Sequence, residues 1–207
     1  MNRAEILAEF RERVRDKVQP YAWSDTRCFR ALSLGQDQFC KDTGFFRDTA
    51  TYTIATVAGT AAYAIPARVI EVLKASIAGA WLKKFTGDAP LVDEGTPCAW
   101  QTDQDTGMVT LHPTPDAVYT VALHVWRKSK IAFLTSGDPE IPDDLQLAMV
   151  EWAAFLFYSD HDREIQDPVK AADHKRTYET YVPQGKQAFR RLCAGHGTFA
   201  PNPIYLV

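Results

Sequence analysis

The sequence lacks the features that mark several large classes of protein. Its four cysteines, Cys28, Cys40, Cys98 and Cys193, form no Cys-x-x-Cys pair and have no histidine at zinc spacing, so we expect free thiols in a reducing compartment. The net charge of −3 argues against nucleic-acid binding as the main function, because phosphate recognition needs a basic excess. The chain begins with mixed charges and has no apolar run of about 20 residues, so we expect neither a secretory signal nor a membrane span.

Motifs of catalysis and cofactor binding are also missing. There is no Gly-x-Ser-x-Gly elbow, phosphate loop, dinucleotide fingerprint or His-Glu-x-x-His sequence. The densest polar cluster, Asp160-His161-Asp162 with Glu164, could be a metal or acid–base site, but it is more simply a charged helix end. His112 and His124 could approach across strands, yet two histidines make an incomplete site. We therefore predict no catalytic, metal or cofactor-binding residues and no enzyme; an enzyme with its site at Asp160-His161-Asp162 stays an alternative.

The most apolar stretch, residues 141–158, is the one around which we expect the fold to be organised. Pro142 suits the first turn of a helix, and two aspartates follow where the helix dipole favours negative charge. The remainder is apolar nearly all round, which predicts a helix buried on most sides. The core residues that we predict from this helix and from the start of the second helix are Trp23, Leu145, Met149, Trp152 and Leu156.

Three further helices are predicted from apolar spacing and end signals. Residues 4–18 show one apolar stripe, and a second helix begins after Ser24 as N-cap and ends near Gly44. Gly35 weakens the regularity expected of that second helix. A last long helix begins at Asp167-Pro168, with a kink or break expected at Pro183.

Between the two pairs of helices, short β-branched and aromatic stretches alternate with turns. The predicted strands are 51–57, 61–65, 69–77, 80–85, 98–102, 108–112 and 119–126. Strands that form one block between helices indicate an α+β fold. We predict a four-helix bundle from residues 1–47 and 141–194, an antiparallel sandwich or barrel-like insertion from 48–135, a connector from 136–140, and an extended tail from 195–207.

Two features point to contacts with partners. Trp81 and Trp126 are flanked by basic residues near sheet edges, and aromatics and arginine are enriched in interface cores. Partial burial in the sheet and, last, base stacking are alternative interpretations. The predicted interface residues are Trp81, Lys83, Lys84, Trp126 and Arg127.

The C-terminal tail, residues 198–207, is apolar, carries no charged side chain and is stiffened by prolines. Tails without a partner are usually polar and disordered, so this one is expected to pack on its own domain or on another chain by strand addition.

Several short motifs, in this order and spacing, resemble the head-to-tail adaptor, or connector, proteins of tailed bacteriophages, over nearly the whole chain. The motifs are Trp23-Ser24-Asp25, the stretch 57–66 followed by 69–72, Gly95-Thr96-Pro97 with Trp100, residues 111–116, residues 119–126, and Ile141-Pro142. The resemblance implies a non-enzymatic virion protein, made in the host bacterial cytoplasm and placed at the head–tail junction.

The resemblance also implies partners. They are the portal protein, a tail tube or nozzle protein, and neighbouring copies of the chain in a twelvefold ring through which DNA passes without specific binding. It implies no membrane partner. The implied portal-binding residues of the tail are Phe199, Pro201, Pro203, Ile204, Tyr205, Leu206 and Val207. A β domain that recognises a ligand such as a glycan through Trp81, Trp100 or Trp126 is the alternative function.

Overall fold

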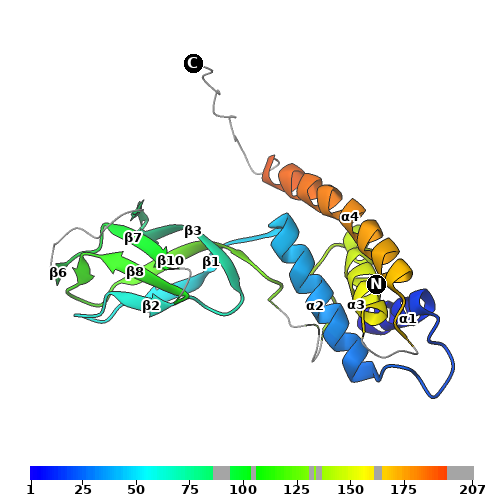
Figure 1. The fold of residues 1–207 in the computed structure, drawn as a ribbon. Helices are drawn as coiled ribbons and strands as arrows, with labels where there is room; N and C mark the ends of the chain where they lie inside the picture. Colours follow the sequence, from blue (N-terminus) through cyan, green and yellow to red (C-terminus); the bar gives the residue numbers. More distant parts are fainter. Residues whose placement is uncertain (86–93, 104–105, 131–132, 134–136, 161–164, 195–207) are drawn as a thin grey trace. The chain divides into compact units, whose positions relative to one another are not determined.

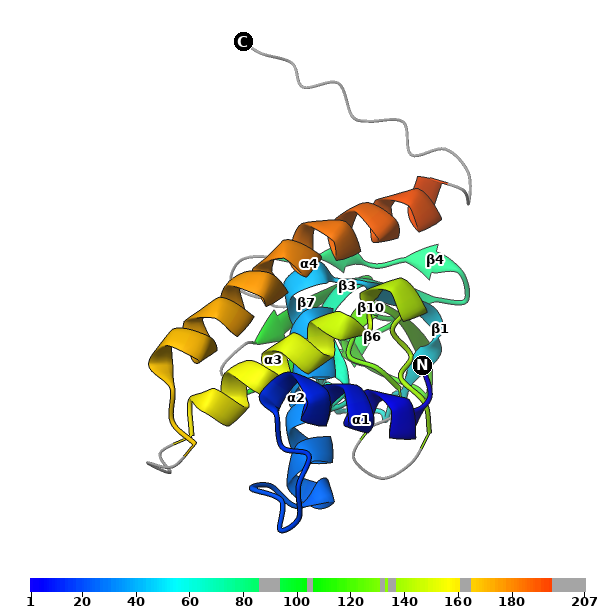
Figure 2. The same ribbon diagram turned by 90° about the vertical axis from the view of Figure 1, so that its right-hand side faces the viewer.

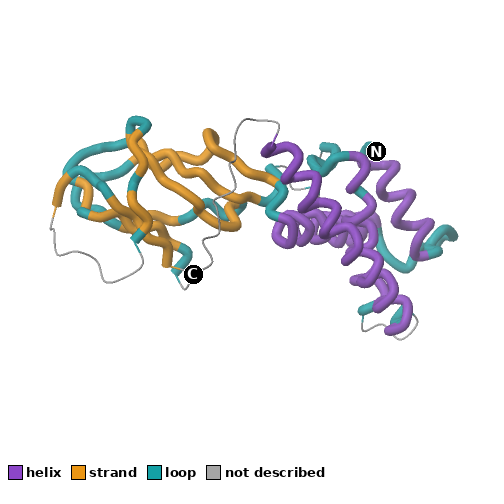
Figure 3. The backbone as a smooth tube through the Cα atoms, turned by 90° about the horizontal axis from the view of Figure 1, so that it is seen from above, coloured by secondary structure: helices purple, strands orange, loops and turns teal. Residues whose placement is uncertain are grey.

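The computed structural model describes residues 1–85, 94–103, 106–130, 133, 137–160 and 165–194. The chain divides into two compact units, a helical unit of residues 1–45 and 129–207 and a β unit of residues 46–128 (Figure 1). Helices and strands are segregated between them, as the colouring in Figure 3 shows, which is an α+β arrangement. The β unit therefore begins and ends somewhat earlier than the predicted insertion, 48–135.

The second helix has the ends that its sequence signals predict, whereas the first ends at Val14, four residues before the end of the predicted helix, 4–18. Helix α1 (Arg3–Val14) opens with a capping box between Asn2 and Glu5. Helix α2 (Asp25–Thr43) opens at Ser24, whose side chain accepts from the Arg27 N–H, and closes at Gly44 in the left-handed conformation.

Helix α2 is continuous through Gly35, which corrects the expectation of an irregular helix. A Cβ atom at Gly35 would lie 2.5 Å from the backbone oxygen of Met149 in helix α3 (Leu147–Tyr158). Glycine therefore permits a close approach of the α2 and α3 backbones, and this packing offsets its poor helix propensity.

The predicted helix of residues 142–158 is divided into two parts. A 3₁₀ turn (Asp143–Leu145) precedes α3, and the Gln146 side chain donates to the Ile141 carbonyl oxygen at 2.9 Å. Polar residues in this first turn favour local side-chain bonds over a regular α-helical start.

Helix α4 (Pro168–Ala194) begins after Asp167, whose side chain accepts from the Lys170 N–H at 3.1 Å. It runs without interruption through Pro183, so the predicted break is wrong. Pro183 is exposed, which lets water bond the carbonyl group that lacks a helical partner.

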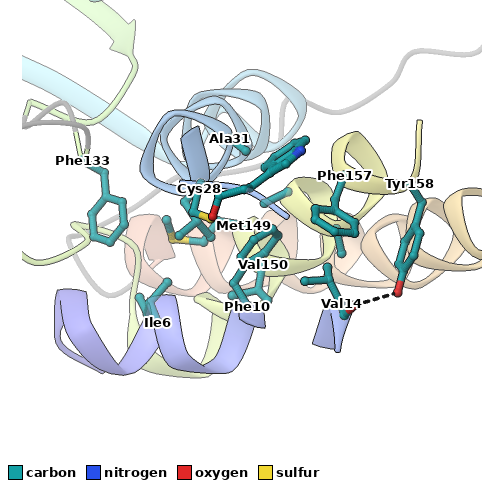
Figure 4. Packing of buried hydrophobic residues seen from close by; sticks show 14 of the residues in the cluster. Ile6, Phe10, Val14, Cys28, Ala31, Phe133, Met149, Val150, Phe157 and Tyr158 are labelled. Atoms are coloured by element: carbon teal, nitrogen blue, oxygen red, sulfur yellow. Dashed lines mark hydrogen bonds between the residues drawn. The ribbon is translucent and has the colours of Figure 1, made fainter. Parts of the chain in front are cut away.

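The core of the helical unit surrounds α3, which contacts α1, α2 and α4 and lies between α1 and α4 in Figure 2. Phe10 of α1 and Trp23 pack on Phe157 of α3, with ring centroids 6.1 and 5.0 Å from it (Figure 4 labels Phe10 and Phe157). The Tyr158 hydroxyl donates to the Val14 carbonyl oxygen at 3.2 Å.

The five residues predicted for the core differ in burial. Trp23, Leu145 and Met149 are buried, whereas Trp152 and Leu156 are half-buried.

The described residues of the β unit form ten short strands in three sheets. They are β1 (Phe46–Ala55), β2 (Ala62–Ala64), β3 (Val69–Ile77), β4 (Ala80–Trp81), β5 (Lys83–Lys84), β6 (Glu94–Gly95), β7 (Ala99–Asp103), β8 (Met108–His112), β9 (Thr114–Pro115) and β10 (Thr120–Arg127). The sheet orders are β1-β10-β3-β4, β2-β8-β7-β5 and β6-β9. Pairing is antiparallel except for β5 with β7 and β6 with β9.

The two four-stranded sheets share one core, as expected of a sandwich. Leu123 and Val125 of β10 and Trp100 and Leu111 of the second sheet are all fully buried in it. The chain crosses between the sheets at Leu82, whose N–H donates to Ala75 in β3. Within the described residues neither sheet closes on itself, so the unit is a sandwich and not a closed barrel.

Candidate interaction surfaces

Of the polar groups considered for a catalytic or metal site, those that the structure describes are dispersed or make structural contacts. Asp160 accepts hydrogen bonds from the Trp23 indole at 3.1 Å and from the Arg27 guanidinium. His161, Asp162 and Glu164 lie outside the described residues. His112 on β8 and His124 on β10 belong to different sheets.

Among the described residues no three acidic, histidine or cysteine side chains gather as metal ligands. Of the cysteines there, Cys28 and Cys40 are buried free thiols and Cys98 is an exposed one. Burial raises the pKa of Cys28 to about 11, which keeps that thiol protonated.

A buried ionic cluster, which the sequence analysis missed, joins three helices. Glu151 of α3 is 1% exposed and pairs with Arg13 of α1 and with His174 Nδ1 of α4, the latter at 2.7 Å. Burial and the Arg13 charge lower the pKa of His174. The sequence signal for this cluster was Glu151 itself, a charged residue within the apolar run of α3. We call Arg13, Glu151 and His174 the Glu151 cluster; its partners are internal, so its role is to hold the helices together.

Five side chains form a tryptophan face on the outer side of the first sheet: Arg47, Lys74, Trp81, His124 and Trp126. On β10 the residues Leu123 and Val125 point inward, so His124 and Trp126 point outward. Across the strands His124 is opposite Lys74, and Trp126 is opposite Arg47.

Trp81 is the most accessible member of the tryptophan face, with 56% of its surface exposed. Its ring meets the His124 ring edge-on, with centroids 4.6 Å apart, and the Lys74 ammonium lies 5.1 Å from its centroid. Burial, followed by the charges of Arg47 and Lys74, lowers the pKa of His124, so this imidazole is neutral at pH 7. The face therefore combines aromatic surface with the cations of Arg47 and Lys74, and the exposed Glu71 lies opposite Trp126 on β3. Aromatic side chains and arginine are enriched in protein interfaces.

The structure does not bring all five predicted interface residues together. Lys83 and Lys84 lie on β5 of the second sheet, where the Lys84 ammonium is 5.2 Å from the Trp100 ring. Arg127 points inward, is 6% exposed, and donates from Nε to Asp48 at 3.3 Å. Arg127 therefore stabilises the sandwich interior, because its place on β10 alternates with that of Trp126.

Two exposed valines mark a tip of the β unit that the sequence analysis did not identify. Val57 and Val118 are 58% and 74% exposed. Their loops are tied together by Thr56, whose hydroxyl accepts from the Tyr119 N–H at 2.7 Å and donates to the Ala117 oxygen at 2.9 Å. Single valines beside turns gave no periodic signal.

The helical unit carries a groove between α2, α3 and α4 with a volume of about 450 Å³. We call it the Trp152 groove; it is lined by Gln38, Asp42, Trp152, Lys175, Tyr178, Glu179, Val182, Pro183 and Lys186. Trp152 is half-buried there, with its ring centroid 4.8 Å from that of Tyr178. The Tyr178 hydroxyl donates to Asp42 at 2.5 Å, which fixes one wall.

Near the end of α4, Leu192 is 58% exposed and stands beside the exposed Arg190 and Arg191. The predicted portal-binding residues, from Phe199 to Val207, follow it and lie outside the described residues.

Comparison with known proteins identifies the family. No helix among the described residues is both long and apolar enough to cross a membrane. A search of curated proteins gave no match to this chain. The family model described as SU10 adaptor protein matches residues 1–196, which include both units and every described helix and strand. The chain therefore belongs to the SU10 adaptor protein family, a family of structural head-to-tail adaptors of phages.

Proposed function

We propose that this protein is a structural component of the virion that joins the portal to the tail. The observation that carries the proposal is the family match over residues 1–196, which spans the helical and the β unit alike.

In this proposal the chain is made in the cytoplasm of the bacterial host and assembles as a twelvefold ring at the head–tail junction. One side of the ring docks on the portal and the other contacts the tail tube or nozzle. The four helices act as a bundle that forms the body of each subunit. DNA passes through the lumen without specific binding, in keeping with the net charge of −3.

The tail is the proposed portal-binding segment. Its residues 198–207 carry no charged side chain, and two prolines lower the entropic cost of ordering it. An apolar, stiffened segment of this kind is suited to a dry contact on a partner surface.

The test has two parts. Purified virions should contain the protein beside the portal protein, and cryo-electron microscopy of the particles should place a ring of it below the portal. Deleting residues 198–207 should abolish docking of the purified protein on isolated portal rings and leave its circular dichroism unchanged. Virions that lack the protein would refute the adaptor function, and docking by the truncated chain would refute the role of the tail.

The tryptophan face is the proposed contact with a neighbouring subunit or the tail, and Lys83 and Lys84 of the second sheet are proposed to take part as well. Its support is the 56% exposure of Trp81 and the Lys74 ammonium beside its ring. A glycan-binding β unit is the second candidate, because sugars stack on exposed indole rings. Binding on a glycan array that Trp81→Ala removes would favour it; no binding by the native protein would exclude it.

A further inference from the structure

We propose that neighbouring copies of this chain join through the two free edges of the first sheet, with Arg47 on β1 of one copy paired with Glu71 on β3 of the next. The inference rests on the proposed ring assembly and names the surfaces by which its subunits meet. The contact can be tested separately from docking on the portal.

The first sheet has an unpaired strand edge on each side among the described residues. Strand β1 is at one end of the order β1-β10-β3-β4, and β4 pairs with β3 only at Ser76 and Ile77. Residues 69–73 of β3 therefore have no neighbouring strand on that side. Unpaired edges accept a further strand through their backbone N–H and C=O groups. Because β1 and β3 are both antiparallel to β10, they run in the same direction, and a second copy in the same orientation continues the sheet by a parallel pair.

A row of three side chains crosses the outer side of this sheet and carries opposite charges at its two ends. Arg47 on β1 is opposite Trp126 on β10, which is opposite Glu71 on β3. Glu71 is exposed, and Arg47 is half-buried with a buried Nε that has no hydrogen-bond partner. Within the part of the chain that the structure describes, neither charge has an ion-pair partner. Each edge therefore presents one half of an ion pair.

A hollow of about 380 Å³ lies along the free edge of β3. It is lined by residues 69–72 of β3, residues 102–103 of β7 and the turns at 65–67 and 107. Two lining residues, Glu71 and Asp103, are exposed acids, and no described lining residue is basic. Asp103 also accepts from the Thr106 hydroxyl at 2.7 Å, which leaves further acceptor capacity on its carboxylate. The hollow is therefore suited to an arginine guanidinium, which presents five donors to carboxylates.

Addition of β1 beside β3 brings the opposite charges together. Neighbouring strands are about 4.8 Å apart, so Arg47 of the next copy can lie directly beside Glu71, and the row of arginine, tryptophan and glutamate repeats across the joined sheets. Lys74, the next outward cation on β3, is three residues after Glu71. The corresponding position on β1 is Ala50, in an uncharged stretch, so no like charges face each other in this register.

A bulge limits the contact to the start of β1. Between Asp48 and Tyr52 the pairing with β10 is shifted, and Asp48 Oδ1 accepts from the Ala50 and Thr51 N–H groups at 3.1 and 2.8 Å. Because these donors are occupied, the added strand pairs with residues 46–49. The contact joins two different edges, so each copy keeps one edge of each kind for its two neighbours, and repetition about an axis closes a ring.

Disulfide trapping tests the contact directly. Within one copy β10 separates residues 47 and 71 by about 10 Å, beyond the roughly 7 Å between Cα atoms that a disulfide spans. A disulfide between these positions therefore joins two copies. In a background of Cys98→Ser and Cys193→Ser, an equal mixture of Arg47→Cys and Glu71→Cys proteins, docked on isolated portal rings, should give a disulfide-linked dimer on mild oxidation. Thr53→Cys mixed with Glu71→Cys is the matched control and should give none, because Thr53 is exposed on β1 beyond the bulge.

Charge reversal measures the contribution of the ion pair. Arg47→Glu and Glu71→Arg should each raise about tenfold the protein concentration that half-saturates portal rings, because like charges then face each other. The double variant should restore the native value, since the substituted side chains again have opposite charges. Circular dichroism should be unchanged in all three variants.

The remaining outcomes separate this contact from the adaptor function. A dimer from Arg47→Cys alone would show that two β1 edges pair symmetrically and would overturn the proposal. Docking on the portal without the mixed disulfide would also overturn it, while the adaptor function would stand. If the native protein does not dock, the adaptor function fails; the mixed disulfide in the free protein at high concentration would then support the edge contact, and its absence would overturn it.

Discussion

The helical unit and the β unit bury their apolar side chains in different ways. In the helical unit α3 is covered by three helices, the α2 backbone approaches it at Gly35, and the Glu151 cluster ties it internally. In the β unit one core layer lies between two sheets, and the outer side of the first sheet leaves Trp81 largely exposed. The helical unit is therefore held together by these internal contacts, whereas the first sheet of the β unit leaves a large aromatic side chain exposed.

Truncation of one large core residue in each unit tests whether the cores are separate. Phe10→Ala in the helical unit and Trp100→Ala in the β unit should each cost about 3–5 kcal/mol, because both side chains are fully buried. Hydrogen exchange should show the loss of protection mainly in the unit that carries the substitution. Equal loss in both units for either variant would contradict the comparison.

The Glu151 cluster should be the next most sensitive feature. Glu151→Ala should lower the free energy of unfolding by about 2–4 kcal/mol, since it removes the buried partner of both Arg13 and His174. Glu12→Ala is the matched control, because the Glu12–Lys17 pair is exposed and its removal should cost less than about 1 kcal/mol. Chemical denaturation measures the free energy of unfolding of both variants. Similar losses would show that the Glu151 cluster contributes no more than an exposed ion pair.

Gly35→Ala distinguishes packing from helix propensity through the sign of its effect. Propensity alone predicts a gain of about 1 kcal/mol, whereas the close approach to Met149 predicts a loss of about 1–3 kcal/mol. Arg30→Ala, at an exposed site on the same helix, should change little. A more stable Gly35→Ala protein would mean that α2 and α3 are not this close.

The pH dependence of stability should carry a contribution from each unit. Because the pKa values of His174 and His124 are lowered in the folded state, the unfolded chain binds protons more readily as the pH falls below 6.5. The folded state should therefore lose stability in that range, and His174→Gln and His124→Gln should each reduce the slope. NMR titration checks the pKa values; a His174 midpoint above 6.5 would reverse the expected sign.

Trp81→Ala should have the smallest effect on stability, within about 0.5 kcal/mol, because the side chain is exposed on a sheet surface. Its effect should instead appear in assembly, as weaker association of subunits or weaker tail attachment. Trp126→Ala is the comparison on the same face, where the half-buried ring should cost more stability. A large loss of stability in Trp81→Ala would assign the ring to the fold and not to a partner.

Much of the helix pattern could be predicted because its signals are local. Ser24 and Gly44 delimit α2, and Asp167-Pro168 opens α4, through backbone chemistry that neighbouring residues supply. The continuity of α4 through Pro183 was not predictable, because it depends on the side of the helix that faces solvent. The role of Gly35 likewise depends on α3, more than a hundred residues later.

The interaction surfaces were less predictable, because sequence neighbours need not share a face. Lys83 follows Trp81 closely but belongs to another sheet, and Arg127 follows Trp126 but points inward. The Glu151 cluster forms only where three helices contact one another, and the residues next to Glu151 in the sequence do not indicate which helices those are. The nearly continuous apolar run identified α3 as central, yet it did not reveal that Trp152 faces a groove.

The pairing of β1 with β10 has a consequence for how the chain was assembled in evolution. Phe46 and Arg127 are direct partners across these strands, so the β unit enters and leaves at one place, and Asp48–Arg127 fastens that entrance. Direct partners in an antiparallel pair are about 5 Å apart, a gap that a short loop can close. The β unit could thus be replaced or deleted as a whole without changes to the helical sequence on either side of it.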